Sequence, residues 1–260
     1  MLPEQIVNVE TNLQIVDTNT GEVASIEEFV NNISQNRSVA TLATKKAEYG
    51  YFYTKEITRV IDAGKKSVKI EHGSTVTKTG GNIPPQYFTI SASLLTSNTI
   101  NGSFDTTSFN TKYNVKKGTF VSTIKSISSS KFWIGRTRVT AHYKGGHTSK
   151  KEIKSDKFLL NKKGFNYPYY FDSRMKKATP KPSSTLWKKI DKSDRVSWTT
   201  SKRVTYLDWY EDKYGHIFRT FYEVHHIKPR EYGGNNEYKN LMPINADFHR
   251  KLVSPWWTNY

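Results

Sequence analysis

The sequence predicts an α+β protein in which a β-rich antiparallel N-terminal region is followed by a small C-terminal module. Alternating Thr, Ser, Tyr, Val and Ile residues between about 50 and 150 predict short strands. A Pro/Ser/Lys stretch over 176–185 is typical of a linker. The last forty residues contain the pattern of a strand, a loop, a second strand and a helix.

The first segment, residues 1–50, is acidic, with 3 basic and 7 acidic residues. Ser25 and Glu28 have the spacing of a capping box. Apolar residues then follow at helical spacing: Ile26, Phe29, Val30 and Ile33. We therefore expect a short amphipathic helix near 26–34.

The second segment, residues 51–175, is expected to form a basic β-rich domain. Together with the linker it carries most of the positive charge, because residues 51–185 hold 24 basic and 7 acidic residues. Glycine and proline pairs such as Gly80-Gly81 and Pro84-Pro85 separate its alternating stretches, as expected of an antiparallel sheet, a sandwich or a barrel. The net charge of +17 favours polyanions, either nucleic acid or an anionic cell surface.

The third and fourth segments are a linker over 176–185 and a C-terminal domain over 186–260. Three tryptophans at eleven-residue spacing, Trp187, Trp198 and Trp209, are interpreted as core anchors of this domain. Residues 217–224 alternate as a strand does.

Several classes of protein are excluded by what the sequence lacks. There is no cysteine, which excludes disulfides, zinc-thiolate sites and thiol nucleophiles. No apolar run approaches the ~18 residues of a membrane-spanning helix, and the N-terminus has no signal-peptide pattern. An exported mature form is the favoured interpretation, with a cytoplasmic protein as the alternative.

The C-terminal stretch concentrates residues suited to phosphodiester chemistry. A His225-His226 pair ends the expected strand, and Asn240 and His249 follow after a glycine turn. Residues 240–244 are expected to form the returning strand and residues 245–252 a helix, with Asn245 as its N-cap. Imidazole nitrogens bind divalent metals, and a free imidazole beside a metal can act as a general base. Trp256-Trp257 and Tyr260 are interpreted as a lid over the apolar face of this module.

This arrangement resembles the HNH, or ββα-metal, endonuclease family over about 40 residues, and is most similar to the DNase domains of colicin- and pyocin-type toxins. The resemblance rests on these residues in register: Arg219, Tyr222, Glu223, His225, His226, Pro229, Gly233, Gly234, Asn240 and His249.

The resemblance implies a role for each of the central residues. His225 and His249 would ligate one divalent metal, and His226 would be the general base that deprotonates water. Asn240 would fix the loop and help to orient His226. Glu223 and Arg219 would support the phosphate side of the cleft. The cations expected to contact DNA phosphates are Arg219, Lys228, Arg230, Arg250 and Lys251.

One position departs from the colicin-type pattern. Val253 stands where those domains carry a further histidine ligand. Two protein histidines leave more positions for water and phosphate, so Mg²⁺ is the expected ion, with Mn²⁺, Ni²⁺ or Zn²⁺ as alternatives.

The sequence therefore predicts a metal-dependent endonuclease that hydrolyses DNA, cuts non-specifically and serves as an antibacterial toxin, with an acidic immunity protein as a possible partner. One alternative is a site-specific HNH enzyme of the restriction, homing or phage type. Another is a polyanion-binding protein with an inactive nuclease module. RNA is also left open as a substrate.

Overall fold

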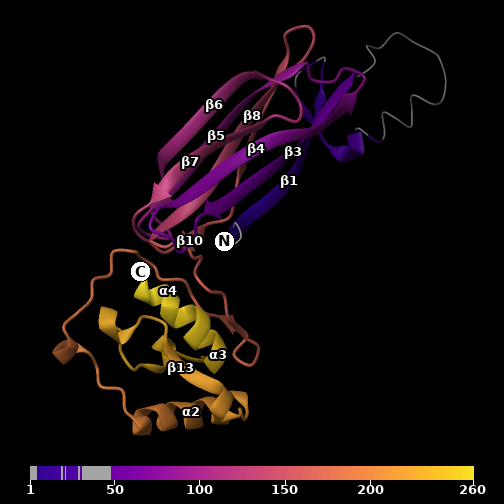
Figure 1. The fold of residues 1–260 in the computed structure, drawn as a ribbon. Coiled ribbons are helices and arrows are strands. Elements are labelled where there is room, and N and C mark those ends of the chain that lie inside the picture. The colour runs from indigo at the N-terminus through magenta and orange to yellow at the C-terminus, as the bar shows by residue number, and fades with distance from the viewer. Residues whose placement is uncertain (1–4, 19, 21, 29, 31–47) are drawn as a thin grey trace. The chain divides into compact units, whose positions relative to one another are not determined.

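The computed structural model describes residues 5–18, 20, 22–28, 30 and 48–260 (Figure 1). Contacts divide the chain into two compact units. Unit 1 comprises Met1–Thr96, Phe104–Ile127 and Trp133–Lys157, and unit 2 comprises Ser97–Ser103, Ser128–Phe132 and Phe158–Tyr260. These units are defined by contacts, whereas the four segments expected above follow charge and composition, so that domain prediction stays a prediction.

Unit 1 is built from two antiparallel sheets. The first has the strand order β2-β1-β3-β4-β7, and the second places β8, β5 and β6 side by side with β9 next to β8. The strands are β1 (Gln5–Asp17), β2 (Val23–Ala24), β3 (Tyr49–Ile61), β4 (Val68–Gly81), β5 (Tyr87–Ser97), β6 (Asp105–Val115), β7 (Phe120–Ile127), β8 (Lys131–His142) and β9 (Thr148–Lys154).

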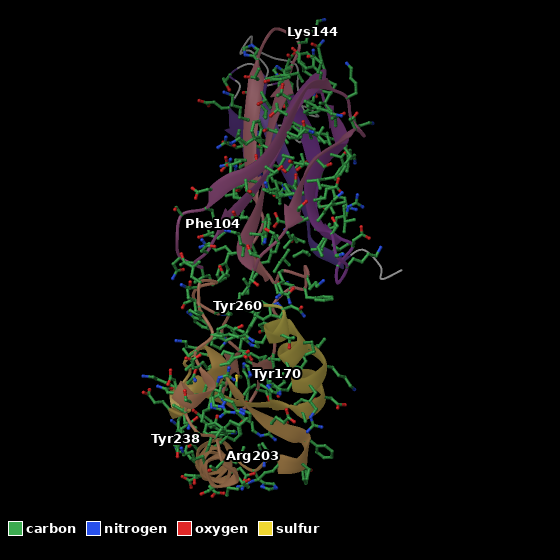
Figure 2. The ribbon with its side chains drawn as sticks, turned by 60° about the vertical axis from the view of Figure 1, so that its left-hand side comes forward. Phe104, Lys144, Tyr170, Arg203, Tyr238 and Tyr260 are labelled. Carbon is green, nitrogen blue, oxygen red and sulfur yellow. The ribbon has the colours of Figure 1, made fainter. Side chains whose placement is uncertain are left out.

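The two sheets pack face to face around a shared core. Buried residues of the first sheet, such as Phe52 and Val76, belong to the same apolar cluster as Phe88 and Ile90 of the second. Burial alternates along β3, because successive side chains of a strand point to opposite faces. Side chains accordingly fill the space between the sheets (Figure 2).

The same interior also contains a buried polar row. His72 is 2% exposed, and its two ring nitrogens lie 2.9 Å from Thr58 Oγ1 and 3.0 Å from Thr137 Oγ1. Burial lowers the pKa of His72 to about 4, so the ring is neutral near pH 7. Gly135 lies against this ring, where a Cβ atom would collide with it.

The capping box of the N-terminal segment is confirmed. Ser25 N donates to Glu28 Oε2 at 2.7 Å, and Glu28 N donates to Ser25 Oγ at 3.1 Å. Residues 26–28 and 30 are helical. Phe29 and Ile33, which the helix prediction also uses, lie outside the described residues.

Unit 2 is held together by a helix that packs on a strand pair. The helix α2 (Thr200–Tyr214) begins after Thr199, whose side chain accepts from Lys202 N, and ends at Gly215. Its buried face joins residues of β13 (Tyr222–His226) and β14 (Leu241–Asn245) in one apolar cluster. Arg203 lies on α2, and the Tyr238 ring packs against Tyr206 and Trp209 of the same helix (Figure 2). Trp198 and Trp209 pack against the same cluster, as expected of core anchors.

The remaining elements of unit 2 are short. They are β10 (Phe158–Leu160), β11 (Phe171–Asp172), β12 (Lys177–Ala178), 3₁₀ turns at Lys192–Asp194, Arg219–Phe221, Arg230–Tyr232 and Tyr238–Asn240, α3 (Ala246–Phe248), a π-helical turn (His249–Val253) and α4 (Ser254–Thr258). Asn245 caps α3 by accepting from Phe248 N at 3.0 Å, which confirms the expected N-cap. Trp256 and Trp257 are buried.

The expected α+β fold class is wrong. Strands account for 47% of the structure and helices for 19%, so the protein is mostly β, with curled antiparallel sheets. Unit 2 contributes three short α-helices, and the chain does not end in a small ββα module. One reason lies in β1, which occupies Gln5–Asp17 of the acidic segment, where only a helix was expected, and pairs with β3 along its length. That pairing partner is distant in sequence, and local pattern does not reveal it.

Two C-terminal elements also differ from expectation. The strand expected over 217–224 begins only at Tyr222, because Arg219–Phe221 form a 3₁₀ turn. The helix expected over 245–252 is interrupted by the π-helical turn that begins at His249. A π-turn inserts an extra residue into a helix and frequently occurs at functional sites.

Candidate active site

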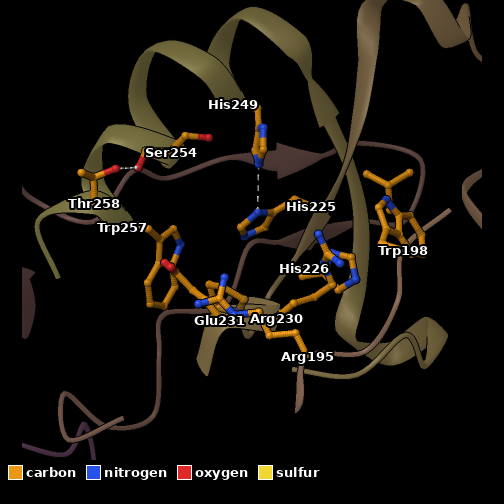
Figure 3. A pocket seen from close by; sticks show the side chains of 12 residues that line it. Arg195, Trp198, His225, His226, Arg230, Glu231, His249, Ser254, Trp257 and Thr258 are labelled. Carbon is orange, nitrogen blue, oxygen red and sulfur yellow. Dashed lines mark hydrogen bonds between the residues drawn. The ribbon is translucent and has the colours of Figure 1, made fainter. Parts of the chain in front are cut away.

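The two histidines at the end of β13 line one cleft of unit 2. The cleft has a volume of about 440 Å³, and His225, His226 and His249 all lie on its wall (Figure 3). Adjacent residues of a strand point to opposite faces, but β13 ends at His226, where the chain turns into the loop that leads to Asn240. Both imidazoles can therefore face the same space.

His225 and His249 form a close pair. His225 Nδ1 lies 3.3 Å from His249 Nε2, which is long for a hydrogen bond between ring nitrogens. Two imidazole nitrogens bound to one ion at ~2.0–2.1 Å and separated by this distance would subtend an angle of roughly 105–110° at the ion, close to tetrahedral. The spacing thus fits two ligands of a shared divalent metal.

Burial keeps His225 in the neutral form that metal binding requires. His225 is 3% exposed, and its Nε2 atom has no hydrogen-bond partner among the described residues. Burial, and then the nearby His249 and His226, lower the pKa of His225. A neutral imidazole offers a lone pair to a metal ion.

Glu223 supports the second histidine of the pair. His249 Nδ1 donates to Glu223 Oε2 at 2.6 Å, and Arg250 Nε donates to Glu223 Oε1 at 2.6 Å. Burial opposes the charge on Glu223, but the hydrogen bonds from Arg250 and His249 outweigh it and lower its pKa. A carboxylate at Nδ1 fixes the proton there and turns the Nε2 lone pair of His249 toward His225.

His226 has a different environment from the other two histidines. Its Nε2 lies 2.9 Å from Asn236 Oδ1, and the ring packs edge-to-face with Trp198 at 4.7 Å between centroids. Asn236 Nδ2 donates to the Ser197 carbonyl at 2.9 Å, which fixes the orientation of the amide. Because Oδ1 only accepts, Nε2 of His226 carries the proton and Nδ1 retains the lone pair.

The pKa of His226 is lowered, first by burial and then by the charges of Arg230 and His249, whereas the bond to Asn236 raises it. A lowered pKa keeps the imidazole unprotonated at neutral pH, the state that a general base needs.

Asn240 fixes the loop, as expected, but does not contact His226. Its Oδ1 accepts from Lys228 N at 2.8 Å, and its Nδ2 donates to the carbonyls of Lys228 and Asn235. The loop is tight at Gly234, where a Cβ atom would collide with the Lys228 carbonyl. Asn236, which the sequence analysis did not single out, makes the contact that was expected of Asn240.

Arg219 is not on the wall of the cleft, and its guanidinium is paired with two carboxylates. Its Nη2 donates to Asp208 Oδ1 at 2.7 Å and to Glu211 Oε2 at 2.6 Å, both on α2. The hydrogen bond from Arg219 is the main cause that lowers the pKa of Glu211 to about 2.

The other predicted phosphate contacts are dispersed. Arg250 pairs with Glu223, and Lys251 pairs with Asp247 at 3.2 Å. Lys228 lies over the Trp187 ring and lines a separate hollow with Gly233 and Gly234. Of the five cations, Arg230 alone is on the wall of the histidine cleft.

The C-terminal part of the cleft wall is formed by Ser254, Trp257 and Thr258. Val253 is 2% exposed and takes no part in the wall, which agrees with its apolar character. Trp257 stacks on Trp187 with parallel rings, and Tyr260 lies 4.9 Å from Trp257 between centroids. These aromatics form a packed cluster, as the lid interpretation expects.

The side chains present offer a metal ion two nitrogen ligands. No group of three or more His, Asp or Glu side chains arranged to hold a metal occurs in the part of the chain that the structure describes. A divalent ion bound here would therefore take its other ligands from water or substrate oxygens. Arg195 and Trp198 also line the cleft, and because they precede the histidine pair by more than twenty residues, the motif did not identify them as part of the site.

Comparison with known proteins gave no relative: no family model, no curated protein and no solved structure matches the chain. Among the described residues, no helix is long and apolar enough to cross a membrane.

Proposed function

We propose that the protein is a metal-dependent endonuclease that hydrolyses DNA phosphodiester bonds in the histidine cleft of unit 2. The observation that carries this proposal is the meeting of two kinds of histidine in one cleft. His225 and His249 lie at the spacing of two metal ligands, and His226 beside them is a neutral imidazole with a free Nδ1.

The residues divide the reaction between them. His226 Nδ1 accepts a proton from a water molecule that attacks the phosphorus, and Asn236 holds the ring in the required tautomer. His225 and His249 would hold the divalent ion, with Glu223 fixing the orientation of His249. When bound, the ion supplies Lewis-acid stabilisation of the charge that develops on the phosphate oxygens. Mg²⁺ is the proposed ion, and Mn²⁺, Ni²⁺ and Zn²⁺ are the alternatives to test.

DNA is the proposed substrate because the chain is strongly basic and because its motif resembles that of HNH nucleases. The net charge is +17, and phosphate contacts supply affinity without sequence information. Non-specific cutting follows from that affinity. An antibacterial role, export and an acidic immunity partner rest on the resemblance to toxin DNases alone.

The test is a digest of supercoiled plasmid by the purified protein in Mg²⁺, Mn²⁺, Ni²⁺ or Zn²⁺, each compared with EDTA. We expect a smear of fragments that requires a metal. Replacing the base by His226→Ala should reduce the rate by about 10²–10⁴-fold, the contribution of a general base. The matched control is His147→Ala, which removes an exposed histidine of unit 1.

Each outcome separates the candidate functions. Stable discrete fragments would support a site-specific enzyme instead. If plasmid stays intact in every metal, the remaining candidate is a polyanion-binding protein with an inactive nuclease module. If His226→Ala cuts at the wild-type rate, His226 is not the general base.

A further inference from the structure

Two arginines from distant segments meet on the wall of the histidine cleft. Arg195 follows the 3₁₀ turn Lys192–Asp194, and Arg230 begins the turn after Pro229. Both line the cleft together with His226, and Figure 3 draws them next to each other, below His226 in that view. Arg195 belongs to no motif of the C-terminal stretch.

Neither guanidinium is neutralised by a carboxylate within ion-pair distance among the described residues. Arg230 Nη1 donates to the Val196 carbonyl at 3.0 Å, and Arg195 Nη2 makes a long contact of 3.5 Å with the Ile190 carbonyl. Carbonyl partners hold a guanidinium in place without cancelling its charge. Glu231, the acidic residue on the same wall, pairs with Lys189 at 3.0 Å.

Arg195 also has an unused donor. Its Nε atom is buried and has no hydrogen-bond partner among the described residues. A buried N–H without a partner costs free energy, and the described residues do not satisfy all the donors of this guanidinium. Two other arginines near β13 differ, since Arg219 contacts Asp208 and Glu211, and Arg250 contacts Glu223. Arg203 is held by backbone carbonyls, but it is not on the wall of the cleft.

The positive charge acts on the position where chemistry is proposed. Arg230 and His226 lie on the wall of the same cleft. An anion bound beside this imidazole would be attracted by the positive charge of Arg230. Guanidinium groups bind phosphate oxygens through two parallel N–H bonds, which positions the anion as well as holding it.

We propose that Arg195 and Arg230 form the phosphate-binding wall of the cleft and hold the phosphate group of a nucleic acid strand beside His226. This inference rests on the proposed endonuclease function and adds the residues that position its substrate. It adds Arg195 to Arg230, which the sequence already suggests as a phosphate contact, and gives these two the role that sequence similarity suggests for Arg219.

The test measures binding of a short fluorescein-labelled DNA duplex in EDTA by fluorescence anisotropy at several salt concentrations. Arg195→Gln and Arg230→Gln should each weaken binding by about tenfold or more, the loss expected for a hydrogen bond to a charged group. Each should also lower the slope of log affinity against log salt by about one, because one fewer phosphate is neutralised. Arg195→Lys keeps the charge and should retain most of the slope.

The matched control is Arg174→Gln, which removes an exposed arginine of unit 2 outside the cleft and should leave the slope unchanged. If Arg195→Gln and Arg230→Gln both bind with the wild-type affinity and slope, the inference is overturned. If the wild type cuts no plasmid but both variants have a smaller salt slope, the endonuclease proposal fails and the phosphate-binding wall stands. If the wild type cuts plasmid but both variants keep the wild-type salt slope, the endonuclease proposal stands and the phosphate-binding wall is excluded.

Discussion

The contact between Glu223 and His249 predicts that metal affinity depends on Glu223, although Glu223 is not itself a proposed metal ligand. The change Glu223→Gln keeps the size of the side chain but removes its charge. The carboxylate accepts the Nδ1 proton of His249 at 2.6 Å, and His249 Nε2 lies 3.3 Å from His225 Nδ1. Losing the carboxylate weakens both the orientation and the basicity of His249.

The expected magnitude is a 10–100-fold loss of metal affinity, the usual effect of removing a carboxylate behind a histidine ligand. That loss corresponds to about 1.4–2.7 kcal/mol. Isothermal titration calorimetry with Ni²⁺ or Zn²⁺ measures it without any need for nuclease activity. His249→Ala should remove the site, and circular dichroism reports whether each variant is folded.

Asp247→Asn is the matched control, because Asp247 is an exposed carboxylate in α3 whose ion partner is Lys251. The reasoning is refuted if Glu223→Gln binds metal as tightly as the wild type while His249→Ala does not bind. It is also refuted if Asp247→Asn loses as much affinity as Glu223→Gln, since a general loss of negative charge would then explain both.

Three further predictions concern other contacts. Asn236→Ala should lower the cutting rate about tenfold or more with KM unchanged, because His226 loses its tautomer-fixing partner, whereas Asn235→Ala should cut normally. Because the pKa of His72 is lowered to about 4, the folded state should lose up to about 3 kcal/mol of stability as the pH falls from ~6.5 toward 4. Urea unfolding of the wild type should show this loss. An equal pH dependence in His72→Gln would refute the assignment. Gly135→Ala should lower the free energy of unfolding by about 1–3 kcal/mol, because the added Cβ collides with the His72 ring. Thermal melting should show a smaller loss when the same change is made in a His72→Ala background.

Local features of the sequence predicted local structure well. The capping box at Ser25 and Glu28 and the N-cap at Asn245 are both confirmed, because each depends on residues within one turn. The fold class could not be obtained in this way. β1 forms a strand because β3, more than thirty residues away, supplies its hydrogen bonds, and the π-turn at His249 depends on how the C-terminal segment packs.

The candidate site could likewise be predicted only in part from the sequence. The three histidines of the motif lie in one cleft. His225 and His226 end β13, and His249 begins the helical turn that follows β14 and α3, so consecutive elements carry all three. Asn236 and Trp198 could not be chosen from the motif. Asn236 is one of two adjacent asparagines in a turn, and Trp198 precedes a helix in another part of the unit.

The arginines illustrate why a count of charges does not identify a phosphate site. Arg219 matches the family position, yet two carboxylates on α2 accept its hydrogen bonds, and breaking those contacts would be a cost of binding DNA there. Arg195 and Arg230 are held by backbone carbonyls, so a phosphate can bind them without displacing a carboxylate. The useful quantity is therefore the positive charge left unpaired by the fold, and in the histidine cleft of unit 2 that charge lies on Arg195 and Arg230.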